Sequence, residues 1–431
     1  MADLDTTDAP PNTTPAQPPD ASPAITAEPR VARPIIARPA IRAVGHQYVE
    51  LLQKHLNQLH STRAHPNRVL HLDAVVTTML LGFYSSIATL RGLEDLSQQD
   101  TLADQLPNER VCRSTLSDNL RGFDAHSLLP IIHSLMKCLP ALRRQDPDLH
   151  GLLKTIVALD GSIFTVPADV AWAIAVHRRG GQPGRQIRLN AHLDVLHFVP
   201  LSLQVCGADA GGEAASFIAS LEAGRIYLID RGFVDFAFLH AVLDVGSDLV
   251  VRLKADTTFV PVRDNPLSDE DRAAHVLSDR IGHLPGSAGS PGFGQRLFRE
   301  VVLYDAKNKK QVRLLTTLLE IPAHVIGKLY RYRWAVELFF RWLKCVAKFE
   351  HLVSHDRNGI TLQFYVATIA MLLTYLRTGS KPGVYEQRCL QWIVSGLGTL
   401  ETNLKILERR NREREQNRVR HAAKLAAKNG N

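Results

Sequence analysis

Three acidic residues, Asp160, Asp230 and Glu337, are placed where the sequence could bring them to one metal site. Asp160 and Asp230 each follow a short apolar, β-branched run, Thr155 to Leu159 and Arg225 to Ile229. Carboxylate oxygens suit Mg²⁺ or Mn²⁺ rather than zinc. Two such charges on neighbouring strands repel each other unless a cation lies between them. An aspartate that ends a strand is also a common turn former, so neither residue indicates a metal site by itself.

Glu337 lies in the stretch Leu329 to Lys348, whose residue pattern is unusual for a helix. With Tyr330 at zero, Arg333, Glu337, Arg341, Lys344 and Lys348 fall within roughly 80° of one another on a helix. Nearly all the other residues are apolar, which predicts a mostly buried helix with one charged stripe. Arg333–Glu337 and Glu337–Arg341 pairs contribute only tenths of a kcal/mol. A polyanion or a metal is therefore expected opposite the stripe.

A third carboxylate beside Asp160 and Asp230 completes a two-metal site. Such a site activates a water or hydroxyl and stabilises the leaving oxygen in phosphodiester chemistry. Arg333, Lys344 and Tyr330 would then hold phosphate oxygens, the arginine through a bidentate fork and the lysine as a point charge.

The elements around these residues predict an α/β fold. Ligands collect at the carboxyl ends of strands in open α/β sheets, and the two aspartates follow such strands. Residues 172–177 and 187–203 are expected to be strands of a hairpin, and 234–243 a helix. Strands return at 249–254, 296–304 and 311–319. Strands that alternate with helices in this way are typical of an α/β domain.

Four regions are expected along the chain. Residues 1–42 are rich in Ala, Pro and Thr and are expected to be disordered. Residues 43–150 have helical periodicity, with helices at 48–59, 70–90 and 116–135, and form a helical DNA-binding or assembly domain. Residues 151–380 form the catalytic domain, with a β-rich insertion at about 248–321. Residues 381–431 are a helical, basic C-terminal segment, whose end is either a solvated helix or a frayed tail.

Composition narrows the class of protein further. The net charge of +8 favours nucleic acid first and an anionic membrane second as partner. Five scattered cysteines without a CxxC pair indicate neither a disulfide framework nor a zinc knuckle. The apolar runs 75–90 and 360–376 are shorter than the ~20 residues of a membrane span and are expected to be core helices. With no secretory signal, the expected location is the cytoplasm, with no membrane partner.

The motifs resemble a known family. The spacing Tyr330-x2-Arg333-x3-Glu337-x6-Lys344 is similar to the signature of the insertion-sequence-four (IS-four) branch of DDE transposases. Asp230-Arg231-Gly232-Phe233 resembles that family's second-aspartate motif, and Leu159-Asp160-Gly161-Ser162 its first. The resemblance covers about residues 150–380 and implies a ribonuclease-H-like fold with a β-insertion.

The resemblance also implies an activity, namely DNA cleavage at transposon ends and strand transfer into target DNA. Asp160, Asp230 and Glu337 would hold Mg²⁺, with Mn²⁺ as a substitute, while Tyr330, Arg333 and Lys344 position terminal phosphates. The implied partners are double-stranded DNA and a second copy of the chain on paired ends. Some relatives hold a flipped base with a tryptophan of the insertion, but no tryptophan lies between Asp230 and Trp334. A DNA hairpin intermediate is therefore left open.

Other assignments rest on the residues alone. Arg252 and Lys254 alternate on a predicted strand and are candidate DNA contacts, although a solvent-facing strand gives the same pattern. Arg341 and Lys348 share the charged stripe but lie outside the family signature. Two other functions are compatible with the sequence: a DNA-binding protein derived from a transposase that no longer cuts, and a ribonuclease-H-like nuclease without strand transfer.

Overall fold

The computed structural model describes residues 71–429, with gaps at 88, 100–109, 140–146, 150–151, 153, 178–182, 287–291, 307, 347–351, 379–382 and 395–396. The segment expected to be disordered, 1–42, and the helix expected at 48–59 lie outside the described residues, as does Lys348.

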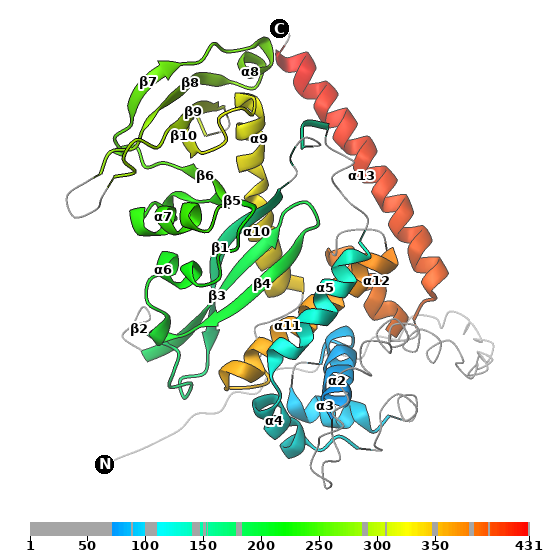
Figure 1. Ribbon diagram of the computed structural model, residues 1–431. Helices are drawn as coiled ribbons and strands as arrows, with labels where there is room; N and C mark the ends of the chain where they lie inside the picture. Colours follow the sequence, from blue (N-terminus) through cyan, green and yellow to red (C-terminus); the bar gives the residue numbers. More distant parts are fainter. Residues whose placement is uncertain are drawn as a thin grey trace, which may run out of the picture. The chain divides into compact units, whose positions relative to one another are not determined.

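A mixed β-sheet forms the centre of the described chain (Figure 1). Strand β1 (Thr155–Val166) pairs antiparallel with β3 (Pro183–Asp194), and β2 (Ile174–His177) and β4 (Val199–Cys206) share the outer edge of β3. On the other side, β5 (Arg225–Ile229) pairs parallel with β1, and β6 (Asp248–Arg252) pairs parallel with β5. The order β4-β3-β1-β5-β6 is a ribonuclease-H-like sheet, as the family resemblance implied.

The two faces of the sheet are covered by different helices because successive side chains of a strand point to opposite faces. Val157 and Leu159 of β1 join a core with α6 (Glu213–Ile218) and α7 (Phe236–Asp244). Ile156 and Ala158 face a second, larger core, to which α9 (Ala323–Tyr332) and α10 (Trp334–Arg341) contribute. Figure 1 shows α6 and α7 on one side of the sheet and α9 and α10 on the other.

The β-rich segment extends the same sheet rather than forming a separate one. Strands β7 (Val260–Asp264), β8 (Val276–His283), β9 (Phe298–Asp305) and β10 (Lys310–Thr316) pair antiparallel, and β10 pairs with β6. A one-turn helix, α8 (Asp269–Ala273), lies between β7 and β8 and has a capping box from Ser268 and Asp271. Since β6 also pairs with β5, the segment from 248 begins with a strand of the central sheet.

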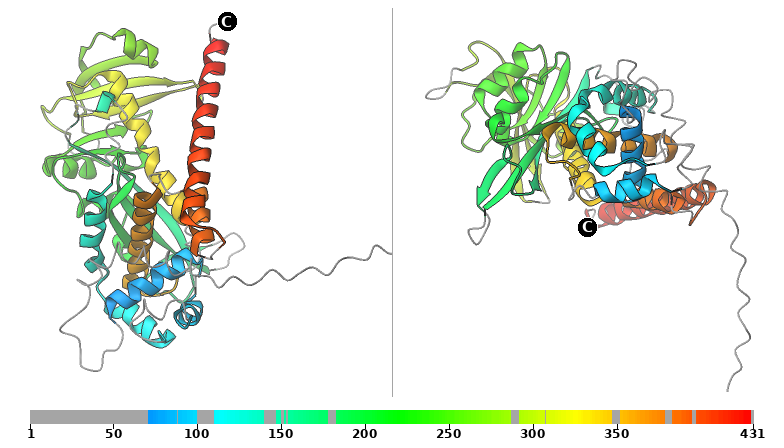
Figure 2. Two further views of the ribbon diagram at one scale, coloured as in Figure 1. Left: turned by 90° about the vertical axis from the view of Figure 1, so that its right-hand side faces the viewer. Right: turned by 90° about the horizontal axis from the view of Figure 1, so that it is seen from below.

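The N-terminal helices pack against the long helix α11 (Arg357–Thr378), as both views of Figure 2 show. They share one continuous hydrophobic core with the larger face of the sheet. Asn358 fastens the junction: its Nδ2 donates to the carbonyls of Leu120 and Arg121, and its Oδ1 accepts from the N–H of Ala125. The helices that contact α11 are α2 (Leu72–Tyr84), α4 (Arg113–Gly122) and α5 (Leu129–Lys137), while α3 (Leu90–Ser97) packs against α2 and α4.

One predicted helix of this region is interrupted. The expected helix at 116–135 breaks after Gly122, where Asp124 caps the short 3₁₀ helix Ala125–Leu128 by accepting from the N–H of His126. A second 3₁₀ turn spans Pro147–Leu149. The apolar run of α11 is long enough to cross a membrane by length and composition, yet 89% of it is buried inside the protein. Its hydropathy is therefore explained by its place in the core.

The C-terminal part of the described chain is helical. Helix α12 (Val384–Val394) packs against α13 (Leu400–Asn429), a 30-residue helix. Arg410 and Arg414 of α13 stack over the ring of Tyr385 at 4.2 and 5.2 Å. The basic end of the chain is thus an extended helix through Asn429, and of the two forms left open by the sequence the structure has the helix.

Candidate active site

Asp160 lies in the middle of β1 and not at its end, which corrects the sequence prediction. The parallel pairing of β1 with β5 stops at Ala158, whereas the antiparallel pairing with β3 continues to Val166. β1 therefore runs past the end of β5, and Asp160 is the first residue on the larger-core face beyond that end. Its carboxylate Oδ1 accepts from the N–H of Gly161 at 2.9 Å.

Asp230 directly follows β5, as predicted, and precedes the 3₁₀ turn Arg231–Phe233. Its Oδ1 accepts a hydrogen bond of 2.9 Å from the hydroxyl of Tyr330 on α9. Burial raises the pKa of Tyr330 above its ordinary value, and the nearby charge of Asp230 raises it further. Tyr330 is therefore a neutral donor that fixes the position of the Asp230 carboxylate.

The predicted single helix over 329–348 is divided. Helix α9 ends at Tyr332, α10 begins at Trp334, and a π turn spans Trp342–Val346. At Arg333 the hydrogen bonds shorten to the i→i−3 pattern: its N–H donates to the carbonyl of Tyr330, and its own carbonyl accepts from Val336. Local 3₁₀ and π turns within a helix often mark functional positions. Because of these two turns, the charged side chains no longer point along the single stripe that a uniform helix would form.

The prediction that this stretch is mostly buried is wrong for two large residues. Trp334 is 48% exposed and Leu338 is 40% exposed. Val336, Phe339 and Phe340 do enter the larger core. Trp334 is exposed because it lines a cavity.

Arg333 interacts electrostatically with all three carboxylates. Its Nη2 donates to Glu337 Oε1 at 2.6 Å, and its side chain is only 12% exposed. Its positive charge lowers the pKa of Asp160, and the negative charge of Asp230 raises its own. Arg333 thus pairs directly with Glu337 and acts through its charge on Asp160 and Asp230.

Among the three carboxylates, Asp160 is the one whose negative charge its surroundings disfavour most clearly. Burial raises its pKa to about 6. The N–H of Gly161 and the charge of Arg333 act in the opposite direction, whereas the charges of Glu213 and Glu337 raise the pKa further. Sequence analysis did not single out Glu213, because a glutamate in the first turn of a helix is an ordinary helix-start residue.

The donor set suits a hard divalent cation. All the candidate ligands are carboxylate oxygens, which Mg²⁺ and Mn²⁺ prefer. A cation would also offset the repulsion between Asp160 and its neighbours Glu213 and Glu337. Within the part of the chain that the structure describes, no three acidic, histidine or cysteine side chains stand in a metal-holding group. In this arrangement Glu337 pairs with Arg333, so Asp160, Asp230 and Glu337 would hold a cation only after this ion pair opens and the carboxylates move closer together.

A cavity of about 650 Å³ adjoins the carboxylates. It lies between the β-rich segment and α9, and its wall carries both positive charge and aromatic rings. The residues that serve this argument are Arg252, Tyr304, Tyr330, Arg331, Arg333 and Trp334. Cations and aromatic faces together suit phosphates and bases of a nucleic acid.

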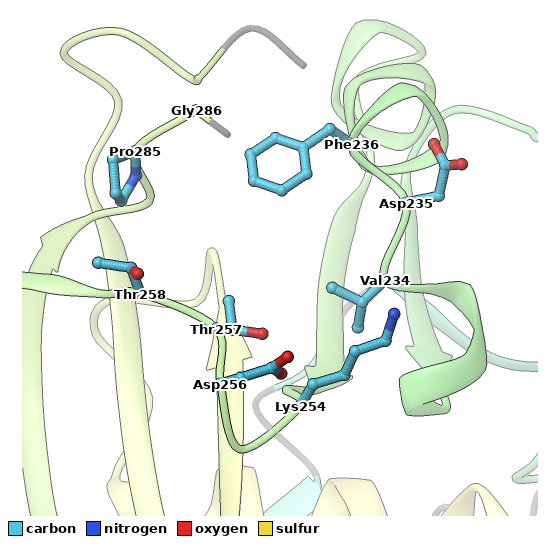
Figure 3. A pocket seen from close by; sticks show the side chains of 9 residues that line it. All are labelled: Val234, Asp235, Phe236, Lys254, Asp256, Thr257, Thr258, Pro285 and Gly286. Atoms are coloured by element: carbon cyan, nitrogen blue, oxygen red, sulfur yellow. The ribbon is translucent and has the colours of Figure 1, made fainter. Parts of the chain in front are cut away.

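The remaining predicted site residues lie on several elements around the carboxylates. Arg252 ends β6, lines the 650 Å³ cavity and acts electrostatically on Tyr330. Lys254 is exposed and lines a separate cavity of about 380 Å³ with Val234, Asp235 and Phe236 (Figure 3). Lys344 lies in the π turn, with its Nζ 4.9 Å from the ring centre of Phe164 on β1. Arg341 is exposed on α10.

Comparison with known proteins identifies the family of the chain. The family described as Transposase DDE domain matches residues 151–373, which is more than half of the chain. The chain belongs to the DDE transposase family.

Three relatives of this DDE transposase domain carry transposase names. A putative transposase, y4zB, from Sinorhizobium fredii is 25% identical over 40% of this chain and 48% of its own length. A probable transposase for insertion sequence element IS5377 from Geobacillus stearothermophilus is 36% identical over 17% of the chain and 19% of its own length. A putative transposase for insertion sequence element IS4SA from Synechocystis is 23% identical over 63% of this chain and 73% of its own length. The chain thus spans about half the length of the first of these relatives and less of the second.

Among solved structures, the piggyBac transposase synaptic complex with hairpin DNA is similar to this DDE transposase family member over 84% of the chain and 82% of that protein. The sequence identity is 10% and the TM-score is 0.37.

The raised pKa of Asp160 predicts how the stability of this DDE transposase depends on pH when no metal is bound. Its pKa is about 6 in the folded chain and 3.8 when unperturbed, so between these values the folded state binds the extra proton. Stability conferred by this group therefore increases as pH falls through 6. We expect Asp160→Asn to be more stable than the wild type at pH 7.5 without divalent cations, and this advantage to shrink by pH 4.5.

Urea unfolding at the two pH values, with EDTA present, measures the difference in free energy of unfolding. Asp256→Asn, which replaces an exposed aspartate, is the control. An advantage of Asp160→Asn that stays constant or grows towards low pH would contradict the prediction.

Proposed function

We propose that the chain is an active transposase that cuts DNA at the ends of a mobile element and joins the freed ends to target DNA. The match of residues 151–373 to a transposase DDE domain supports this function most, and within that domain Arg333 pairs with Glu337 and acts electrostatically on Asp160 and Asp230. The partners are double-stranded DNA, as terminal inverted repeats and as target, and a second copy of the chain on the paired ends.

Bound Mg²⁺ or Mn²⁺ would lower the pKa of a water or hydroxyl and stabilise charge on phosphate oxygens. Asp160, Asp230 and Glu337 would hold the cation through their carboxylate oxygens. The Tyr330 hydroxyl keeps Asp230 oriented through its 2.9 Å hydrogen bond. Because α9 and α10 adjoin at Arg333, one backbone segment positions both Tyr330 and Glu337.

Arg333 has two tasks in this proposal. Without DNA, its guanidinium is the counter-charge of Glu337 at 2.6 Å. A planar guanidinium also binds phosphate through two parallel hydrogen bonds. A DNA phosphate in the adjoining cavity would compete with Glu337 for Arg333 and leave the glutamate to bind the cation. Arg252 and Lys344 would add positive charge on either side, and Lys254 would contact the DNA further from the carboxylates.

The test uses the full-length protein and labelled duplexes that end in the inverted repeats flanking its gene. With Mg²⁺ or Mn²⁺ we expect cleavage at the repeat ends and joining of the cut ends to a supercoiled plasmid, and with EDTA neither product. Binding without cleavage would indicate the inactive DNA-binding protein. Cleavage without joining would indicate a nuclease.

A further inference from the structure

Helix α9 carries Tyr330 and leads directly into Arg333, yet it begins without a capping side chain of its own. It starts after Pro322, whose side chain has no oxygen to accept from the free N–H groups of the first turn. Asp271 of α8, 53 residues before His324, supplies the acceptor. Its Oδ1 accepts from the N–H of His324 at 2.8 Å and lies 3.0 Å from His324 Nδ1. The β-rich segment therefore caps α9.

The same carboxylate belongs to the capping box of α8. Asp271 Oδ2 accepts from the N–H of Ser268 at 3.0 Å, and the N–H of Asp271 donates to Ser268 Oγ at 3.1 Å. Burial would raise the pKa of Asp271, but the hydrogen bonds from Ser268 and His324 hold it below its ordinary value. One buried, ionised carboxylate thus joins the first turns of α8 and α9, which lie side by side in Figure 1.

A buried arginine holds the residues just before α9 in a similar way. Arg299 of β9 forms a two-bond ion pair with Asp279 of β8, with both distances at 2.7 Å. Its Nη1 donates to the carbonyl of Leu319 at 3.0 Å and to that of Ile321. The start of α9 is therefore fastened to the β-rich segment at two separate points.

Helix α8 also lies next to the 650 Å³ cavity beside the carboxylates. His275, shortly after α8, lines that cavity, and its carbonyl accepts from the N–H of Tyr304 at 2.9 Å. Helix α9 lines the same cavity through Gly327 and Tyr330. The segment that caps α9 is therefore continuous with a cavity wall.

We propose that Asp271 is a positioning residue for the active site: by capping α9 from the β-rich segment, it sets where this helix presents Tyr330 and Arg333. The inference rests on the proposed function, in which Tyr330 orients Asp230 and Arg333 releases Glu337 to the cation. Because α9 is one continuous helix, a change at its first turn also shifts the Tyr330 hydroxyl. A displacement of about 1 Å near the chemistry can lower a rate on the order of a hundredfold.

Single-turnover cleavage and DNA-end binding by the full-length protein test this role. We expect Asp271→Ala to lower the cleavage rate at saturating DNA by at least about tenfold. Its affinity for the DNA ends should stay that of the wild type, because Asp271 lies outside the cavity. Asp271→Asn keeps an oxygen that can accept from the N–H of His324, so it should recover most of the lost rate.

The matched control is Ser268→Ala. It removes the hydroxyl that caps α8 but leaves the Asp271 carboxylate at the start of α9, so its cleavage rate should match the wild type. Hydrogen–deuterium exchange of peptides that cover 323–332, without DNA or metal, measures the anchoring itself. Exchange there should become faster in Asp271→Ala and stay unchanged in Ser268→Ala.

The two measurements separate this inference from the proposed function. If the wild type does not cleave the DNA ends, the proposed function is wrong, whereas faster exchange in α9 of Asp271→Ala would still establish the anchor. Unchanged exchange would refute the anchor. If the wild type cleaves and Asp271→Ala is no slower than Ser268→Ala, Asp271 is not a positioning residue. Equal losses of rate and DNA affinity, or no recovery in Asp271→Asn, would also overturn the proposal.

Discussion

Asp230→Asn is expected to reduce metal-dependent DNA cleavage by at least about a thousandfold, because the stabilisation that a bound metal provides is several kcal/mol. Asp230 follows β5 directly and is held by the Tyr330 hydroxyl at 2.9 Å. Asparagine keeps the oxygen that accepts this hydrogen bond but removes the charge that would bind the cation. The fold should therefore remain intact while the chemistry is lost.

Cleavage rates on duplexes with the element's own ends measure this effect, with circular dichroism and thermal melting to confirm folding. Asp256→Asn is the control, since Asp256 is an exposed aspartate that lines the neighbouring cavity. Equal cleavage by Asp230→Asn and the wild type would refute the role assigned to Asp230. Equal loss in Asp256→Asn would show that the effect is not specific to the carboxylate site.

Arg333→Ala is expected to have the second large effect, this time on the DNA-free protein. Removal of one partner of a buried ion pair leaves an uncompensated charge, at a cost of 3–5 kcal/mol in well-buried cases. Because the Glu337 side chain is 31% exposed, water would screen part of this cost, and we expect the free energy of unfolding to fall by about 2 kcal/mol. DNA-end binding should weaken as well, since a phosphate contact is lost.

Divalent cations provide the sharper readout for this variant. If Asp160, Asp230 and Glu337 surround a cation site, Mn²⁺ can supply the charge that Arg333 no longer does. Manganese should then raise the melting temperature of Arg333→Ala more than that of the wild type. Arg331→Ala, which removes an exposed arginine from the same cavity, is the control. A destabilisation that Mn²⁺ does not reverse at all would argue against a shared cation site.

The sequence marks candidate site residues where residue type and spacing alone suggest chemistry. Asp230 follows an apolar strand, and both the strand and its end are readable from residue type. Tyr330, Arg333 and Glu337 could be associated because their spacing places them within two helical turns. The order of the ribonuclease-H-like sheet followed from the resemblance, and the family match over residues 151–373 confirms the family.

Features set by tertiary contacts could not be predicted in this way. Asp160 lies inside a strand because β3 extends beyond β5, and strand length depends on the partner as much as on the strand itself. The break at Arg333 leaves no trace in the apolar pattern, since arginine is a good helix former. Glu213 is far from every motif, and its effect on Asp160 depends on how α6 lies on the sheet.

The shared core around α11 has a consequence for how such a chain can change in evolution. Helix α11 packs against α2, α4 and α5, and it also contacts strand β4. Asn358, in the first turn of α11, hydrogen-bonds to Leu120 at the end of α4 and to Ala125 just after it. The N-terminal helices are therefore not an exchangeable module joined by a linker. A lineage that exchanged these helices for another domain would have to rebuild one side of α11 as well, so this region should change by substitution within its helices rather than by domain shuffling.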